Sequence, residues 1–121
     1  MDVARYPEIE SYPTKDGSTI REWFGPGSAA ANQSLAEATI APGAATTAHY
    51  HRTSEEIYLV TAGGGRLRIG ERECDVEAGD CALIPPGAIH RIENTSDEDL
   101  VIVCACSPPY SHEDTFLCEE D

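Results

Sequence analysis

Short apolar segments, each ended by glycine or proline, constrain the fold of this chain more than any other feature. Over 121 residues, no window repeats apolar side chains at the i, i+3, i+4 spacing of a helix for three turns. Turn signals separate the segments, among them Pro42–Gly43, the triple glycine at 63–65 and Pro85–Gly87. Strands at such intervals are typical of an all-β sandwich or barrel. The predicted strands span residues 19–24, 35–40, 45–51, 56–61, 66–69, 74–76, 80–84, 88–93 and 100–106.

Length and composition indicate one globular domain. Hydrophobic residues make up 40% of the chain and charged residues 25%, which is ordinary for a folded protein. A chain of 121 residues is long enough for a single core and too short for two. The first thirty residues are less regular and are expected to add an edge strand. The tail from Ser107, which closes with Glu119, Glu120 and Asp121, is expected to lie on the surface.

The charge balance excludes two classes of partner. Eight basic and twenty-two acidic residues give a net charge of −14, which repels nucleic acid and anionic membranes. The longest unbroken apolar run, Leu100–Cys106, is too short to span a bilayer. The first residues carry no apolar segment after a basic start, so no signal peptide is predicted. We therefore expect a cytoplasmic protein that binds a small molecule, and neither nucleic acid nor a membrane.

The five cysteines are an odd number and lack C-x-x-C spacing. Without a secretory signal they are expected to be reduced thiols that pack as small apolar side chains. Cys104 and Cys106 lie two residues apart on a predicted strand and therefore share one face. This pair is compatible either with two buried thiols or with a C-x-C metal or redox pair.

Residues 49–60, HYHRTSEEIYLV, contain the first polar cluster. His49 and His51 are two apart on a predicted strand, so their side chains point the same way about 6.6 Å apart and can converge on one ion. Taken alone, the pair is more often explained by histidines on the surface or in a hydrogen-bonded core. The glutamate pair that follows is ambiguous too. Alternation favours an inward Glu55 over Glu56, because Ile57 and Leu59 then also point inward.

The second polar cluster lies in residues 79–94, GDCALIPPGAIHRIEN. Two consecutive prolines fix two φ angles and remove two N–H donors, so the turn at Pro85–Gly87 is stiff. A stiff turn aims the next strand, and with it His90, in a fixed direction. Taken alone, His90 is also compatible with a hydrogen-bonded core histidine.

Together the two stretches resemble the cupin family. The first cupin motif, G-x5-H-x-H-x3/4-E-x6-G, is matched by Gly43, His49, His51, Glu56 and Gly63. The second motif, G-x5-P-x-G-x2-H-x3-N, is matched by Gly79, Pro85, Gly87, His90 and Asn94. Fifteen residues, 64–78, separate the motifs, as in compact microbial members of the family.

The resemblance implies a small double-stranded β-helix, or jelly-roll, barrel formed by one domain over residues 1–121. The barrel that carries the motifs would span about 35–106, with edge strands in 1–34 and a tail in 107–121. In the family, the matching residues bind one divalent metal ion. Carried over by position, these ligands are His49, His51, Glu56 and His90. The spacing to Gly63 selects Glu56, against the alternation argument.

Three imidazoles and one carboxylate suit Fe, Mn, Ni, Co, Cu or Zn, and leave positions for a substrate or dioxygen. The resemblance therefore implies a metal-dependent enzyme that acts on a small oxygenated substrate, by oxidative, dioxygenase-like chemistry. A Lewis-acid isomerase, cyclase or decarboxylase and a non-catalytic binding protein are the alternatives, because the fold selects none of these. Tyr58 shares the face of Glu56 and is the candidate catalytic residue, or else a core aromatic.

The expected surroundings of the site follow from the same assignment. With Glu56 inside, Ile57 and Leu59 face outward and need cover. Since cupins commonly pair, we expect a homodimer. Trp23 and Tyr110 are expected to cap the barrel mouth, and His112 to be solvated rather than a ligand.

Overall fold

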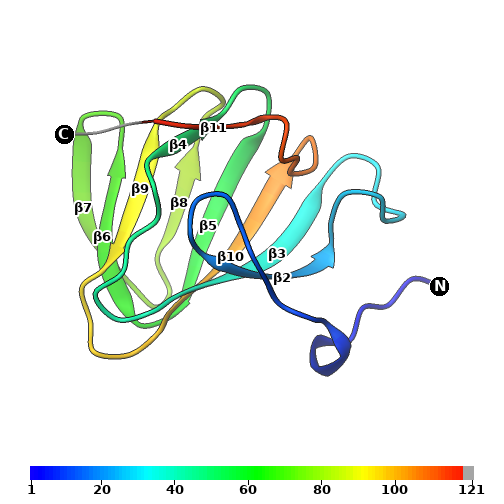
Figure 1. Cartoon of the computed structure of the whole chain (residues 1–121), viewed down its shortest axis with the longest axis horizontal. Coiled ribbons are helices and arrows are strands. Elements are labelled where there is room, and N and C mark those ends of the chain that lie inside the picture. Colours follow the sequence, from blue (N-terminus) through cyan, green and yellow to red (C-terminus); the bar gives the residue numbers. More distant parts are fainter. Residues whose placement is uncertain (119–121) are drawn as a thin grey trace.

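The computed structural model describes residues 1–118, so the surface prediction for Glu119, Glu120 and Asp121 falls outside the described residues. Two antiparallel sheets pack face to face and curl into a short barrel (Figure 1). One has the order β1-β2-β3-β10-β5-β8 and the other β11-β4-β9-β6-β7. The strands are β1 (Tyr12–Pro13), β2 (Thr19–Phe24), β3 (Ser34–Ile40), β4 (His49–His51), β5 (Glu55–Ala62), β6 (Gly64–Ile69), β7 (Arg72–Glu77), β8 (Cys81–Ile84), β9 (His90–Asn94), β10 (Leu100–Ser107) and β11 (Thr115–Leu117).

The predicted all-β class and the double-stranded β-helix are confirmed. Over residues 1–118 the helical content is one 3-10 turn, Tyr6–Glu8. No helix in this described part is long and apolar enough to cross a membrane. The two N-terminal strands lie at the edge of the six-stranded sheet, where β2 pairs with β3.

The core fills the space between the two sheets. Its buried residues come from both layers: Ala38, Ile40, Tyr58, Val60, Leu67, Ile84, Ile92, Leu100 and Ile102. Strand β5 alternates regularly, with exposed and buried residues in turn along its length. Glu56, Tyr58 and Val60 point inward, while Glu55 and Ile57 point outward. The alternation argument for Glu55 is therefore wrong. It failed because the outer face of this sheet is also apolar, so hydrophobicity does not identify the inner face.

Two local predictions need correction. The segment predicted as a strand over 45–51 forms a strand only at His49–His51, with an isolated bridge from Ala45 to Glu93. The predicted surface tail contains β11, which lies along β4 (Figure 1). Thr115 in this strand is only 3% exposed. A three-residue strand carries too little periodicity to be recognised from sequence.

Gly65 is required by close packing rather than by its backbone angles. A Cβ atom at this position would overlap the backbone carbonyl oxygen of Glu93 and lie 3.1 Å from Cδ2 of Leu100. Gly65→Ala is therefore expected to lower the free energy of unfolding by about 1–3 kcal/mol, measured by urea denaturation. Gly64→Ala is the matched control, because its Cβ would only come 3.3 Å from the backbone oxygen of Val76. Equal losses in the two variants would contradict the packing argument.

Candidate metal centre

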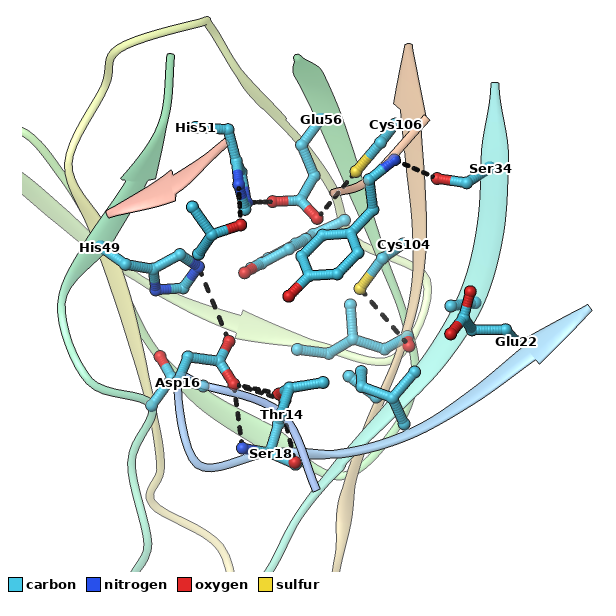
Figure 2. Close-up of a pocket in the computed structure, with 18 of the residues that line it drawn as sticks. Thr14, Asp16, Ser18, Glu22, Ser34, His49, His51, Glu56, Cys104 and Cys106 are labelled. Carbon is cyan, nitrogen blue, oxygen red and sulfur yellow. Dashed lines mark hydrogen bonds and ion pairs between the residues drawn. The ribbon is translucent and has the colours of Figure 1, made fainter. Parts of the chain in front are cut away.

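Three buried histidines meet inside the barrel. His49 and His90 are direct partners on the neighbouring strands β4 and β9, and His51 is two residues along β4. One ring nitrogen from each histidine can be chosen so that all three lie within 4.8 Å of one another. The side chains are at most 5% exposed. The structure thus brings together the three histidines selected by the two sequence motifs, with His51 and His49 on one wall of the cavity (Figure 2).

Backbone carbonyls fix the orientation of two rings. Nδ1 of His49 lies 2.7 Å from the carbonyl oxygen of Thr47, and Nδ1 of His90 lies 2.9 Å from that of Ala88. A carbonyl oxygen only accepts, so both rings donate a proton from Nδ1. In the neutral ring, Nε2 then carries a free lone pair. Such hydrogen bonds are the usual way in which a protein orients a histidine that binds a metal.

A hydroxyl fixes the third ring in the same way. Nδ1 of His51 lies 3.0 Å from Oγ1 of Thr115, and this hydroxyl donates its only proton to the backbone oxygen of Ser111. The hydroxyl must therefore accept from the ring, so His51 also donates from Nδ1 and keeps the Nε2 lone pair. Strand β11, which the sequence did not predict, thus contributes directly to the geometry of the centre.

Glu56 approaches the cluster from the opposite sheet. Its Oε1 lies 3.2 Å from Nε2 of His51 and 3.3 Å from Nε2 of His90. Among the described residues, Oε1 and Nε2 of His90 are buried without a hydrogen-bond partner. With the rings neutral, several electron-rich atoms converge with no proton between them, which is costly in a buried site unless a cation is present. Nitrogen and carboxylate donors in this number fit one divalent transition metal.

The titration of these groups agrees with a ligand role. Burial opposes the charge on Glu56, but when the His51 and His90 rings carry a proton toward it, their hydrogen bonds and charge outweigh burial and lower the pKa of Glu56 to about 2. Burial, together with the neighbouring His90, also lowers the pKa of His49. Carboxylate and neutral imidazole are the forms that bind metals, so a divalent ion would take the place of the ring protons that otherwise stabilise the Glu56 carboxylate.

Tyr58 lies inside, as predicted, with its ring edge-on to that of His90 at 5.8 Å between centroids. Burial and the charge of Glu56 hold the pKa of its hydroxyl well above the usual range. The phenol therefore stays protonated and can serve as a hydrogen-bond donor.

Asp16 is a site residue that sequence reasoning missed. It lies in the turn between β1 and β2, and its Oδ2 is 3.6 Å from Nε2 of His49. Its backbone oxygen accepts a hydrogen bond from the N–H of Thr47, which ties the turn to the segment before β4. The only sequence signal was the turn-forming Asp16–Gly17 pair, and nothing in it indicates contact with residue 49.

The two cysteines of β10 line the same cavity without joining the histidine cluster. The thiol of Cys106 donates to Oε2 of Glu56 at 3.3 Å. Burial and the charge of Glu56 raise its pKa, so the group remains a neutral donor. Cys106 therefore holds the second carboxylate oxygen of Glu56 in place. Burial likewise raises the pKa of the Cys104 thiol.

The cavity beside the histidines has a volume of about 60 Å³. Besides the histidines and Glu56, its lining consists of aliphatic side chains from both sheets, the two cysteines of β10, three tyrosines, several serines and threonines, and the carboxylates of Asp16 and Glu22. Tyr110 lines it as predicted, whereas Trp23 does not and packs against Tyr6 instead. His112 is exposed, as expected.

Comparison with known proteins agrees with the fold and the motifs. The sequence profile of the family described as "Cupin domain" matches residues 36–106. An uncharacterised protein of Methanocaldococcus jannaschii is 45% identical over 115 residues, which cover 94% of this chain and 92% of that protein. Protein SchB of Streptomyces halstedii is 31% identical over 86% of this chain and 80% of its own length. The solved structure of KdgF from Halomonas has a TM-score of 0.81 at 15% identity, covers 93% of this chain and 98% of its own, and shows likeness of fold.

Proposed function

The chain belongs to the cupin family, and from this premise we propose that it is an enzyme that uses one divalent transition metal to transform a small oxygenated molecule. One observation carries the proposal. Three imidazole nitrogens lie within 4.8 Å of one another in the buried interior, Oε1 of Glu56 lies 3.2 and 3.3 Å from two of them, and among the described residues this Oε1 and Nε2 of His90 have no hydrogen-bond partner. We assign His49, His51, Glu56 and His90 as the ligands.

A bound metal would supply Lewis acidity or, as iron, redox chemistry with dioxygen. The remaining residues of the cavity bind and orient the substrate. Tyr58 presents a protonated phenol beside His90, and the surrounding apolar side chains exclude water from this part of the cavity. An oxidative, dioxygenase-like reaction on an oxygenated small molecule is the function we propose for this arrangement.

Metal analysis of the protein purified without added ions, followed by oxygen uptake with a panel of hydroxyketones and phenols, tests this function. We expect about one equivalent of metal, and oxygen uptake that needs both the metal and a substrate. Turnover without oxygen would replace the oxidative reaction by isomerase, cyclase or decarboxylase chemistry at the same site. Binding without turnover would indicate a non-catalytic binding protein.

Tyr58→Phe tests the catalytic assignment. The variant keeps the ring and its packing but removes the only proton that Tyr58 can donate. We expect the metal content to be unchanged and kcat to fall by about 100-fold or more on the substrate found in that panel. Steady-state kinetics at equal metal loading measure this. An unchanged kcat would make Tyr58 a core aromatic only.

We also propose that a second copy of the chain covers the outer face of the six-stranded sheet. One ladder row on this face is apolar across four strands, with Leu83 beside Ile57, then Ala105 and Leu35. Leu83 is 56% exposed and Ile57 is 40% exposed in the single chain. A row of four strands is about 15 Å wide, which is sufficient for the centre of a symmetric dimer interface.

Light scattering tests the dimer. The wild-type protein is expected to have twice the mass of one chain, and Ile57→Glu to have the mass of one, because a charge at the centre of the row cannot be desolvated. Cys74→Glu adds the same charge to an exposed site on the other sheet and should remain dimeric. A monomeric wild-type protein would contradict the proposal.

A further inference from the structure

The cavity beside the histidine cluster is lined by acidic side chains without basic ones to balance them. Its lining contains three carboxylates, those of Asp16, Glu22 and Glu56, and no lysine or arginine. A pocket that binds a carboxylate or phosphate ligand normally offers a cation in addition to any metal, most often an arginine fork. Within the described part of the chain, this lining offers none.

Asp16 is held rigidly with one oxygen facing the cluster. Its Oδ1 accepts three hydrogen bonds, from the hydroxyl of Thr14 at 2.7 Å and from the N–H and hydroxyl of Ser18 at 2.9 and 2.7 Å. This leaves Oδ2 facing His49, with the Asp16 side chain only 15% exposed. Figure 2 shows Asp16 and Glu56 reaching the histidines from different sides. The second carboxylate is therefore a built part of the cavity rather than a mobile surface group.

The local charges sum to zero or less before any ligand enters. A divalent ion with three neutral imidazoles and Glu56 has a net charge of +1, and Asp16 beside His49 cancels it. Glu22 adds a further acidic group to the lining. An anion would meet no net attraction here, and a dianion would be repelled by Asp16 more strongly than a ligand with less charge.

The other side chains that line the cavity favour an uncharged ligand. Apolar side chains such as Ile20, Ala38 and Ile102 line the cavity together with the rings of Tyr12 and Tyr110. The volume of about 60 Å³ holds about four to six water molecules at roughly 10–15 Å³ each. This is room for a small head group with two oxygens, such as a hydroxyl next to a ketone.

We infer that the cavity binds ligands that are uncharged in solution and carry a hydroxyl beside a carbonyl, and that Asp16 excludes carboxylate ligands. This inference rests on the proposed metal site and names the substrate class for it. Asp16 is then a specificity-determining residue, which acts by its charge and its fixed position rather than by taking part in the reaction.

Ligand binding to the cobalt-loaded protein tests the inference. After metal analysis confirms one equivalent of Co(II), maltol, an uncharged hydroxypyranone, and oxalate, a dianion, are titrated separately while the visible spectrum of the cobalt is recorded. Each dissociation constant is divided by that of the same ligand with aqueous Co(II) in the same buffer. We expect the protein to favour maltol over oxalate by about tenfold or more on this scale.

Two variants with the same change in net charge locate the effect. Asp16→Asn should tighten oxalate binding by about tenfold but maltol binding by only about threefold, because maltol loses its hydroxyl proton on the metal and then carries one negative charge instead of two. Asp75→Asn, at a side chain 83% exposed on β7, should change neither. Equal effects of the two variants would assign the discrimination to overall charge and overturn the role of Asp16. If Asp16→Asn loses its cobalt, Asp16 is needed for metal binding, and its assignment as a residue that only excludes anions is overturned.

Failure of this inference and failure of the proposed function give different results. A wild-type protein that takes up no cobalt would remove the metal site itself. A wild-type protein that holds one cobalt but binds oxalate as well as maltol, on the normalised scale, would overturn the substrate class and leave the metal site intact.

Discussion

His90→Ala is expected to lower the metal affinity by at least about 100-fold, so that the variant emerges from dialysis without bound metal. His90 supplies one of four proposed ligands, and its Nδ1–H bond to Ala88 aims Nε2 at the cluster before any metal arrives. Its side chain is fully buried, so water has little access to the ligand position that the substitution vacates. Elemental analysis and a competition titration with a chromogenic chelator measure the loss.

The matched control is His112→Ala. It removes the one histidine that lies outside the cluster and is exposed, so the metal content should equal that of the wild type. Near-ultraviolet circular dichroism should be similar for both variants, which separates loss of a ligand from loss of the fold. Full metal content in His90→Ala, or equal loss in both variants, would contradict the assignment of the centre.

The site residues that could be predicted from the sequence are those that stand at fixed spacings within a motif. His49, His51 and His90 lie in two motifs whose turns and strands fix their direction, and the structure brings them together. The choice between Glu55 and Glu56 was different, because local alternation gave the wrong answer and the spacing to a later glycine gave the right one. Alternation failed for a physical reason: both faces of β5 are apolar.

The missed residues are those placed by the tertiary fold alone. Thr115 reaches His51 through a three-residue strand at a sequence separation of 64. Asp16 lies beside His49 because the turn before β2 folds back against the segment that precedes β4. There the backbone oxygen of Asp16 accepts a hydrogen bond from the N–H of Thr47. Neither position has a periodicity or a motif of its own. The residues that orient or surround the ligands therefore cannot be predicted from a single sequence.

Glu56→Gln is expected to have opposite effects on the metal-free and the metal-loaded protein. Without metal at pH 8, the Glu56 carboxylate lies 3.2 and 3.3 Å from two ring nitrogens that carry lone pairs. The amide of glutamine has two N–H groups that can donate to those nitrogens, and it carries no buried charge. We expect the metal-free variant to unfold at a higher urea concentration than the metal-free wild type, by about 1–3 kcal/mol.

Metal should reverse the order. A saturating metal at about 1,000 times its dissociation constant stabilises the wild type by about 4 kcal/mol, whereas the variant has lost its anionic ligand and should gain far less. Urea denaturation of both proteins, with metal and with a chelator, gives all four values. A metal-free variant less stable than the wild type would mean that a protonated imidazole already bridges Glu56 to the cluster. The converging lone pairs would then no longer be the reason why this cavity needs a cation.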